Sequence, residues 1–544
     1  MATGAEVLLD VLRTEGVTHL FGNPGTTELP LIDALAGVDD PRYVLALQEA
    51  TAVGMADGYA QMSGRPTFLN LHTSAGLGNA IGNLTNAVAN RTPIVVTAGQ
   101  QDRRHIVSDP LLAGDLVGLA RPVAKWAHEV RTGDELGTIL RRAFRDAAAP
   151  PAGPVFVSLP MDLLDADGAA PAPPPSPVAG GSVAGGIEDV AAMLTATDPD
   201  KLAIIIGDEG ASARHEVAEL AAALGVRVFG SPLYGRQVFD QDDPHWAGPL
   251  APAAAAIRTI LEPFDRVLLV GGQAFLVYPY TPGPALPPST ELVHLSASAG
   301  DVGRTHPVRA ALVGDPAATI RALLPLVRAD VDVAAAAART AALGERRAAS
   351  AAGFDDGASA KYGDAPMAPA AAAHAIVRAL RPNMIVVDEA ITTGSYVRGF
   401  HNGPYLFCRG GGLGWGMPAA LGASLAAGRD PVVCVVGDGS AMYSPQALWT
   451  AAAERLPVVF CVVNNRQYLI LKNALRQRGG PTVTNDRYVG MDLADPPVDF
   501  VRLAESMGVD ATMVEKAADV GDAVRAAIDS GEPHLLELPI AAPH

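Results

Sequence analysis

Two polar motifs, each directly following an apolar stretch, constrain the fold of this chain more than any other feature of its sequence. Gly437-Asp438-Gly439-Ser440 follows the apolar residues 431–436, and Asn464-Asn465 follows the apolar residues 458–463. Both stretches have the length and β-branched content of buried strands, and between them residues 446–455 show helical spacing, with Ser444 as the expected cap. In a right-handed strand, helix, strand unit both motifs emerge at the carboxyl edge of a parallel sheet, where open α/β sheets bind ligands. We therefore expect Asp438 and Asn465 to lie close together.

The residue types at this edge suit a magnesium ion bound to a diphosphate. Mg²⁺ takes about six oxygen ligands, commonly one or two protein carboxylates or carbonyls together with phosphate oxygens. Asp438 and Asn465 would supply a carboxylate and an amide oxygen, and a nearby backbone carbonyl would supply a third ligand. Gly437 and Gly439 lack Cβ atoms, so the backbone can approach a phosphate there. A single Gly-Asp-Gly is more often an ordinary turn at the end of a strand, and the spacing to the asparagine pair is what favours the metal site.

The two motifs at this spacing resemble the cofactor motif of thiamine diphosphate enzymes, in which Gly-Asp-Gly is followed about two dozen residues later by Asn-Asn. The resemblance extends over nearly the whole chain and points to the benzoylformate decarboxylases or close relatives. The segments that carry it are residues 21–30, 45–50, 70–72, 97–101 and 410–414. It implies that the chain binds thiamine diphosphate and Mg²⁺ or Ca²⁺, with Asp438, Asn465 and Gln467 at the metal.

Two changes in composition divide the chain into domains. Residues 166–186 are nearly all Ala, Pro, Gly, Ser and Val, which predicts an extended linker, and residues 330–364 mix an Ala-rich helical piece with turn signals. In the middle part, short apolar stretches alternate with helical segments, which favours another parallel sheet. These stretches are 202–206, 226–229, 267–270 and 292–295. The predicted fold class is α/β, with three doubly wound parallel-sheet domains at 1–168, 187–330 and 365–544, which the resemblance identifies as pyrimidine-binding, central and diphosphate-binding.

The charge balance argues against a nucleic acid or an anionic membrane as the main partner, because 58 acidic residues outnumber 40 basic ones and the net charge is −18. Glu6, Asp10 and Arg13 interrupt any secretory apolar region, and no later stretch approaches about 18 apolar residues, so we expect a cytoplasmic protein. The three cysteines lack Cys-x-x-Cys spacing and lie in apolar stretches, which predicts buried, reduced thiols. They are Cys408, Cys434 and Cys461.

The middle domain shows no clear nucleotide-binding motif. Residues 206–211 do not match Gly-x-Gly-x-x-Gly, and Asp208 and Glu209 would repel a pyrophosphate. Acetolactate synthases, which are relatives, carry FAD in this domain. No residue pattern in this chain demands it, so FAD is not expected.

Glu49 and His72 are the main catalytic candidates. Glu49 lies between a predicted strand, 43–47, and a predicted helix, 50–62, so its carboxylate should lie at a carboxyl edge. Taken alone, Glu49 could be a first-turn residue favoured by the helix dipole, and His72, at the end of the predicted strand 67–71, could be structural. The resemblance implies that Glu49 hydrogen-bonds N1′ of the aminopyrimidine and that His72 assists protonation, which suits its unperturbed pKa of about 6.5. Acetolactate synthases usually lack this histidine, so His72 helps to separate the two activities.

Thr26 and Glu28 lie in residues 22–28, where Asn-Pro-Gly predicts a turn. By resemblance, Thr26 helps to bind the substrate carboxylate and Glu28 is a second active-site carboxylate. The alternative is that Thr-Thr-Glu caps a helix beginning near Leu29. For Thr26 both interpretations stay open.

Tyr278 marks a departure from the benzoylformate decarboxylases, which have a second active-site histidine at this position. A tyrosine, with an unperturbed pKa near 10, can donate a proton but cannot act as an imidazole relay at neutral pH. Loss of a proton donor would favour capture of the reaction intermediate by an aldehyde or a second oxo acid. Carboligation is therefore the alternative activity, and Tyr280 is a neighbour that could take the same place.

The resemblance also assigns the other residues of the site. Apolar side chains that suit an aryl or branched substrate are Leu111, Leu112, Ile470, Leu471 and Ala474, although the last three could equally belong to an ordinary core helix. The residues expected to contact the cofactor are Pro24, Glu49, Ile391, Gly411, Leu413, Gly437, Asp438, Gly439, Ser440, Asn465 and Tyr468.

The sequence thus predicts a thiamine diphosphate-dependent and magnesium-dependent lyase that converts a small 2-oxo acid to an aldehyde and carbon dioxide. Acetolactate-type or benzoin-type carboligation is one alternative, and a non-catalytic thiamine-binding or assembly protein is another. Glu49 together with Asp438 and Asn465 argues against the non-catalytic alternative. The resemblance implies a homodimer or homotetramer with active sites between subunits.

Overall fold

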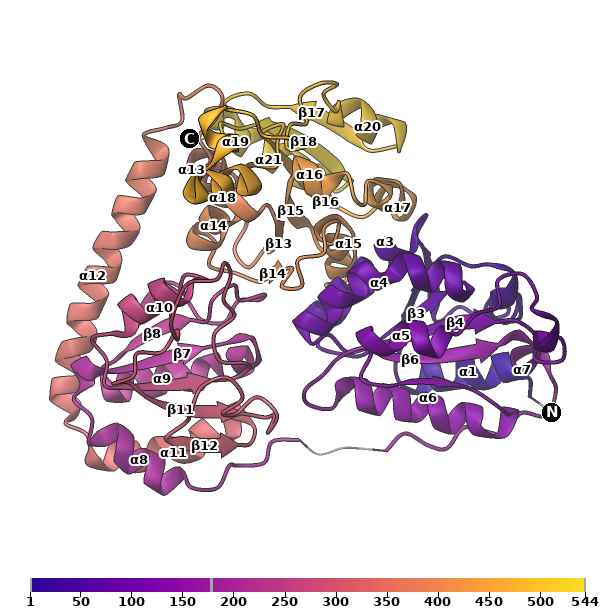
Figure 1. The fold of residues 1–544 in the computed structure, drawn as a ribbon, viewed down its shortest axis with the longest axis horizontal. Helices are drawn as coiled ribbons and strands as arrows, with labels where there is room; N and C mark the ends of the chain where they lie inside the picture. The colour runs from indigo at the N-terminus through magenta and orange to yellow at the C-terminus, as the bar shows by residue number, and fades with distance from the viewer. Residues whose placement is uncertain (1, 177–179, 543–544) are drawn as a thin grey trace. The chain divides into compact units, whose positions relative to one another are not determined.

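Three six-stranded sheets organise the protein, whose computed structural model describes residues 2–176 and 180–542 (Figure 1). The first and last parts of the chain form one compact unit with two of the sheets, and the middle part forms a second unit with the third. Helices connect parallel strands in all three sheets, as in β1–β3, β7–β10 and β15–β16. The predicted α/β class with three parallel sheets is confirmed. The boundaries 1–168, 187–330 and 365–544 stay predictions.

The first sheet has the strand order β2-β1-β3-β4-β6-β5. Its strands are β1 (His19–Gly22), β2 (Arg42–Leu45), β3 (Thr67–Leu71), β4 (Ile94–Gln100), β5 (Ala127–Glu129) and β6 (Val155–Pro160). The α-helices around it are α1 (Gly4–Thr14), α2 (Leu29–Leu35), α3 (Glu49–Ser63), α4 (Thr73–Asn90), α5 (Leu116–Ala120), α6 (Gly133–Ala148) and α7 (Met161–Asp165). As predicted, Glu49 opens a helix and His72 directly follows a strand, but residues 73–76, expected from their composition to form a turn, are the first turn of α4.

The last sheet repeats this order as β14-β13-β15-β16-β18-β17. Its strands are β13 (Ile385–Glu389), β14 (Tyr405–Phe407), β15 (Val432–Gly437), β16 (Val458–Asn464), β17 (Asp510–Met513) and β18 (His534–Pro539). The helices are α13 (Pro369–Arg378), α14 (Ile391–Phe400), α15 (Gly416–Ala426), α16 (Asp438–Ala441), α17 (Gln446–Glu454), α18 (Leu469–Arg478), α19 (Pro481–Thr484), α20 (Phe500–Ser506) and α21 (Ala517–Ser530). The buried strands β15 and β16 pair in parallel from Val432 opposite Val458 to Gly437 opposite Val463, which confirms the predicted strand, helix, strand unit.

The middle sheet has the order β12-β11-β10-β7-β8-β9. Its strands are β7 (Leu202–Ile206), β8 (Arg227–Gly230), β9 (Trp246–Pro249), β10 (Arg266–Val270), β11 (Glu291–Ser296) and β12 (Ala310–Val313), and its α-helices are α8 (Ile187–Thr195), α9 (Arg214–Leu224), α10 (Ala254–Leu261) and α11 (Pro316–Asp330). Four of these strands match the predicted stretches. The edge strands β9 and β12 were not predicted, because each is short and only partly buried.

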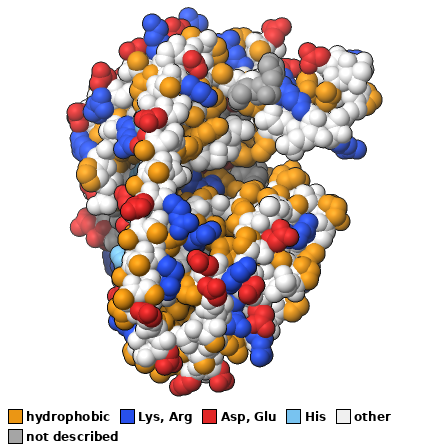
Figure 2. All heavy atoms as spheres, turned by 90° about the vertical axis from the view of Figure 1, so that its left-hand side faces the viewer, with side chains coloured by type: hydrophobic (Ala, Val, Ile, Leu, Met, Phe, Trp, Pro, Cys, Tyr) orange, Lys and Arg blue, Asp and Glu red, His pale blue; other side chains and the backbone are white. Residues whose placement is uncertain are grey.

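Two further local predictions about helices are wrong. Turns were expected within residues 330–364, but helix α12 (Val333–Ser359) continues through Gly353 and Gly357, because a tolerated glycine weakens a helix by only about 1 kcal/mol. Figure 2 faces this largely exposed helix and shows acidic, basic and hydrophobic side chains intermixed along it. The second concerns α17, where Pro445 and not Ser444 occupies the cap position, and the Ser444 hydroxyl is buried without a hydrogen-bond partner among the described residues.

Helices α3 and α15 pack against each other with their backbones in close approach. A Cβ atom on Gly58 would lie 2.1 Å from the carbonyl oxygen of Ala419, and one on Gly422 would lie 1.9 Å from that of Met55. Beside this contact, the Trp415 indole donates to the fully buried carboxylate of Asp57 at 2.7 Å. Burial raises the pKa of Asp57, opposed by its hydrogen bonds. This contact joins the first and last sheets into one core.

All three cysteines are buried and free, as predicted. Burial raises the pKa of their thiols, which holds them in the protonated form. In the described part of the chain, no helix is both long and apolar enough to cross a membrane.

Candidate active site

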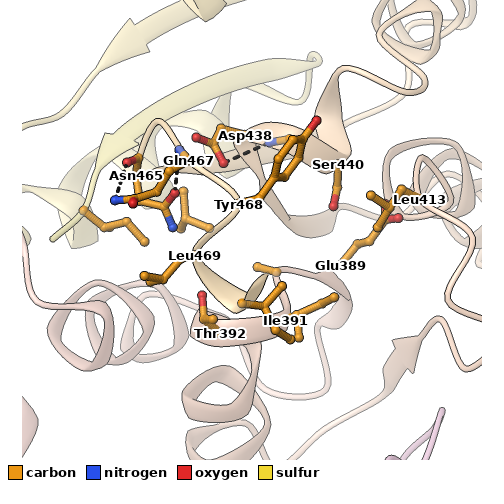
Figure 3. Close-up of a pocket in the computed structure, with 16 residues that line it drawn as sticks. Glu389, Ile391, Thr392, Leu413, Asp438, Ser440, Asn465, Gln467, Tyr468 and Leu469 are labelled. Atoms are coloured by element: carbon orange, nitrogen blue, oxygen red, sulfur yellow. Dashed lines mark hydrogen bonds between the residues drawn. The ribbon is translucent and has the colours of Figure 1, made fainter. Parts of the chain in front are cut away.

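A pocket opens at the carboxyl edge of the last sheet, where β13, β15 and β16 end (Figure 3). The strand order reverses between β13 and β15, and ligands of open α/β sheets bind at such a point. The pocket is lined by Glu389, Ala390, Ile391, Thr392, Leu413, Gly437, Asp438, Gly439, Ser440, Val463, Asn465, Gln467, Tyr468, Leu469, Ile470 and Ile540. The structure therefore brings together nine of the predicted cofactor and metal residues, and Ile470 of the predicted substrate residues.

Asp438 holds a buried carboxylate oxygen that has no partner. Its Oδ1 accepts from the Gly439 amide at 2.9 Å, while Oδ2 has no hydrogen-bond partner among the described residues, and the side chain is only 6% exposed. Burial raises the pKa of this carboxyl group, although backbone amides of Gly439, Arg466 and Gln467 act in the opposite direction. An unpaired buried carboxylate oxygen that lines a pocket is suited to a cation.

The loop after β16 turns sharply and presents Asn465 and Gln467 to the same pocket. Asn464 is structural, since it donates to Glu537 Oε1 at 2.8 Å and accepts from the Arg466 amide at 3.0 Å. Arg466 has a φ of +55°, and Asn465 Oδ1 then accepts from the Gln467 amide at 3.1 Å. Figure 3 shows Asp438, Asn465 and Gln467 together at one end of the pocket and Leu413 at the other. In the Asn464-Asn465 motif, Asn464 therefore holds the loop in place and Asn465 lines the pocket.

The Tyr468 ring explains why residue 439 of the Gly-Asp-Gly motif is a glycine. A Cβ atom on Gly439 would lie 2.6 Å from the Tyr468 ring, so alanine does not fit there without displacing the ring. At Gly437 the nearest atoms to a Cβ are 3.9 Å away, so this structure alone gives no packing reason for that glycine.

Glu389 is a site residue that sequence reasoning missed. Its carboxylate accepts from the backbone amides of Gly414, Trp415 and Gly416 at 2.7, 3.2 and 2.7 Å, and so it caps the start of α15 just beyond Leu413. Burial raises its pKa to about 7, opposed by those three amides. The available signal was a carboxylate two residues after the apolar residues 384–387, which have the length and β-branched content of a buried strand.

His72, the residue before α4, is held by the carboxylate of Glu28, which ends the short 3-10 helix Thr26–Glu28 after β1. Its Nδ1 lies 2.8 Å from Glu28 Oε2 and 3.1 Å from the Thr27 hydroxyl. Glu28 is 1% exposed and also accepts from the amides of Gly25 and Gly99, both at 2.9 Å. An ionised carboxylate only accepts, so His72 donates from Nδ1 and keeps Nε2 as the nitrogen not engaged by Glu28. Thr27 was not predicted, although it stands beside the predicted Thr26.

Glu49 lies on the first turn of α3, half-buried, and its Oε2 accepts from Asn79 on α4 at 3.0 Å. Gly76 packs against it, since a Cβ there would be 3.1 Å from Glu49 Oε1. Glu49 and His72 therefore flank the start of α4, and neither lines the pocket at Asp438. Thr26 is exposed and makes no side-chain cap bond, whereas Glu28 accepts from the Gly25 amide at 2.9 Å and caps the short 3-10 helix Thr26–Glu28, so the capping alternative holds for Glu28 and not for Thr26.

The remaining predicted residues lie outside the pocket. Those exposed to solvent are Pro24, Leu111, Gly411, Leu471 and Ala474, while Leu112 is half-buried with a φ of +70°. Tyr278, in the middle unit, is 66% exposed. Within residues 2–176 and 180–542, no group of three or more His, Cys, Asp or Glu side chains could hold a metal, so a metal at Asp438 needs amide and backbone oxygens.

Three family models cover most of the chain. They describe thiamine pyrophosphate enzymes, pyrophosphate being another name for diphosphate: the N-terminal TPP binding domain at residues 2–116, the central domain at 187–323 and the C-terminal TPP binding domain at 392–538. The chain belongs to the thiamine pyrophosphate enzyme family.

Within this family the chain is similar to benzoylformate decarboxylases over its whole length. It is 35% identical to the benzoylformate decarboxylase of Pseudomonas aeruginosa, over 99% of each chain. The solved 4-hydroxybenzoylformate decarboxylase of Rhodococcus jostii RHA1 matches with a TM-score of 0.86 and 31% identity over 99% of each chain. The benzoylformate decarboxylase of Polynucleobacter necessarius matches with a TM-score of 0.88 and 27% identity, over 100% of this chain and 99% of that one.

Among acetolactate synthases, a putative large subunit from Mycobacterium tuberculosis matches at 32% identity over 98% of each chain, and a large subunit from Parasynechococcus marenigrum at 27%, over 98% of this chain and 87% of that one. The predicted family is confirmed. The chain is a benzoylformate decarboxylase-like lyase, and the similarity supports thiamine diphosphate-dependent decarboxylation of a 2-oxo acid better than acetolactate synthesis.

Proposed function

We propose that the protein decarboxylates an aryl 2-oxo acid to an aldehyde with bound thiamine diphosphate and Mg²⁺ or Ca²⁺. The observation that carries this proposal is the unpaired, buried Oδ2 of Asp438 in a pocket that Asn465 also lines. A divalent cation at that point satisfies the carboxylate and anchors a diphosphate. The relatives are named for benzoylformate and 4-hydroxybenzoylformate, both aryl 2-oxo acids, and this favours an aryl substrate over a branched one.

In this proposal the metal is held by Asp438 Oδ2, by the amide oxygen of Asn465 and by the backbone carbonyl of Gln467. Among the described residues, Asn465 Oδ1 accepts one hydrogen bond, at 3.1 Å, and the Gln467 carbonyl accepts one at 3.0 Å, so each oxygen keeps a second lone pair. Gly437, Gly439 and Ser440 lie at the diphosphate end. Bound thiamine diphosphate supplies an electron sink for the electrons of the broken carbon–carbon bond.

The catalytic side chains come from the first sheet. Glu49 accepts a proton from, or donates one to, the aminopyrimidine N1′, and Asn79 holds its carboxylate in place. His72 moves a proton at Nε2, because Glu28 engages Nδ1 and fixes the ring. Thr26, exposed beside this pair, binds the substrate carboxylate through its hydroxyl.

We further propose that each active site forms between two subunits of a homodimer or homotetramer. Every residue lining the Asp438 pocket belongs to residues 389–540, whereas Glu49 and His72 lie in the first sheet and contribute nothing to it. A second copy of the chain would bring its own Glu49 and His72 to this pocket. Exposed apolar residues near both halves, among them Ile391, Ile470, Leu47 and Leu29, suit burial in such an interface.

The test is a panel of aryl, aliphatic and branched 2-oxo acids, supplied with and without an acceptor aldehyde and resolved by product mass. We expect aldehyde and carbon dioxide from the aryl acids, dependent on thiamine diphosphate and on a divalent metal. Turnover only of aliphatic acids, with acetolactate-type products, would contradict the proposed substrate class.

Carboligation is the second candidate, and Tyr278 favours it. This tyrosine stands where benzoylformate decarboxylases have a second histidine, and its side chain is exposed and available. A slower protonation step would leave more time for an aldehyde to be captured. The same product analysis separates the two outcomes, since carboligation gives a hydroxyketone.

A further inference from the structure

One face of helix α4 carries three buried asparagines that contact the loop before α15. Asn83, Asn86 and Asn90 are at most 3% exposed, and their spacing of three and four residues places them on a single helical face. Asn90 accepts from the Arg409 amide at 3.2 Å, and the Asn83 amide is 3.5 Å from the Gly414 carbonyl. The three asparagines therefore contact the loop along its length, from residue 409 to residue 414.

Asn86, the central one of the three asparagines, makes two hydrogen bonds to the loop backbone. Asn86 Oδ1 accepts from the Gly412 amide at 2.9 Å, and its Nδ2 donates to the Gly412 carbonyl at 2.8 Å. A side-chain amide here makes both bonds that an antiparallel strand would make with that residue. Its Nδ2 also donates to Asn83 Oδ1 at 2.9 Å, which fixes the orientation of the amide.

The close approach of Asn86 to the loop backbone requires glycine at positions 410 and 412. A Cβ on Gly410 would lie 2.4 Å from Asn86 Oδ1 and 2.6 Å from the Asn86 Cα, and one on Gly412 would lie 3.0 Å from Asn86 Nδ2. Gly411 between them has a φ of +76° and open space around it. Two glycines thus allow the approach of α4, and the third allows the turn.

We propose that Asn86 is a positioning residue for the cofactor, because it holds the 410–414 loop in the conformation that presents Gly411 and Leu413 to thiamine diphosphate. This inference rests on the proposed function of that loop. Leu413 lines the Asp438 pocket, and its neighbour Gly412 is the residue that Asn86 binds. The same helix holds Glu49 through Asn79, and in the proposed assembly Glu49 would serve the partner's site, so α4 would support one part of each of two active sites.

The experiment compares Asn86→Ala and the isosteric Asn86→Asp with an Asn402→Ala control in the full-length protein. Asp at position 86 keeps the acceptor for the Gly412 amide but replaces the donor to the Gly412 carbonyl with an oxygen. Asn402 also makes several side-chain hydrogen bonds, to the Gln241 amide at 2.9 Å and to Asp240 and Asp242 at 2.8 Å, but none to this loop. Three quantities are measured: amide hydrogen exchange of residues 410–414 without cofactor, thiamine diphosphate affinity by calorimetry, and the thermal midpoint.

Both Asn86 variants should exchange the loop amides faster and bind thiamine diphosphate at least about tenfold more weakly, while Asn402→Ala changes neither. Should Asn86→Ala not fold, Asn86→Asp carries the test because it preserves volume. Unchanged loop exchange in a folded variant overturns the proposal. Faster exchange with unchanged affinity also overturns it, and the proposed function still stands in that case if Asp438→Ala weakens binding. If Asp438→Ala also leaves affinity unchanged, the proposed cofactor site itself is wrong.

Discussion

Asp438 is buried in a site where an ionised carboxylate is unfavourable unless a cation is present. One oxygen accepts a backbone amide, the other accepts nothing among the described residues, and burial raises the pKa of the group. Removing a charge from water costs several kcal/mol unless a partner compensates it. In the proposed site, a bound divalent cation would relieve this unfavourable burial of the carboxylate.

This reasoning predicts that Asp438→Ala abolishes tight, metal-dependent binding of thiamine diphosphate, with affinity reduced at least about tenfold. Asp162→Ala is the matched control, since Asp162 is similarly buried but pairs with Arg103 at 2.7 Å. Calorimetric titration with and without a chelator measures both. An Asp438→Ala protein whose affinity equals that of the parent in both conditions would show that the metal lies elsewhere.

At Tyr278, we predict that Tyr278→His raises the ratio of aldehyde to hydroxyketone and that Tyr278→Phe lowers it. A positioned proton donor is typically worth 10²- to 10⁴-fold in rate, so even a partial effect is measurable. Tyr280→Phe is measured alongside, because Tyr280 could take the same place, and a ratio that falls in this variant but not in Tyr278→Phe would assign the role to Tyr280. Both products are quantified from the same reaction. If the ratio stays constant in both Tyr278 variants while His72→Ala stops turnover, protonation belongs to His72 and not to Tyr278.

At the scale of elements, β15 and β16 were predictable because nearly every residue in them is buried, so apolar character alone marks both strands. The placement of Asp438 and Asn465 then followed from the handedness of the crossover. The prediction that Ser444 caps α17 was wrong, because Pro445 occupies the cap position. A cap depends on local dihedral angles, which composition does not encode.

Long-range contacts were the other part that the sequence did not reveal. The sequence gives no sign that Gly412 is held by Asn86, which lies more than three hundred residues away in the chain. Glu389 was overlooked for a similar reason, since its three amide donors lie in residues 414–416. The resemblance assigned Gly411 and Leu413 to the cofactor site, but the hydrogen bonds with Asn86 that hold their loop are evident only in the structure.

The contact of α3 with α15 gives a prediction about stability. Alanine normally favours a helix over glycine by about 1 kcal/mol, but at position 58 its Cβ would lie 2.1 Å from a backbone carbonyl that cannot move aside. Gly58→Ala should therefore lower the thermal midpoint. Gly353→Ala, in α12 with nothing within 4 Å of its Cβ, should leave the midpoint unchanged or raise it. Equal midpoints for the two variants would mean that α3 and α15 adjust freely.

For the whole molecule, the separation of Glu49 from the Asp438 pocket predicts complementation between inactive subunits. Glu49→Gln and Asp438→Ala proteins should each be inactive, but a mixed dimer contains one site with both wild-type residues. Mixing the two under conditions of subunit exchange should restore up to about a quarter to a half of the parent activity. Mass spectrometry of the intact assembly verifies that mixed dimers form. Their formation without any return of turnover would place the two residues in the same chain's site.

Because α3 packs on α15, its surface stays uncovered during protein synthesis until α15 has been made. Gly58 leaves the ribosome roughly 360 residues before Ala419, and at about 5 to 20 residues per second the interval is about 20 to 70 s. Once residues 1–168 have been translated, the first domain is complete in length, but its α3 surface, including the buried Asp57, still has no α15 to cover it. The nascent chain must therefore keep an unfinished apolar face from aggregating until nearly four-fifths of it has been translated.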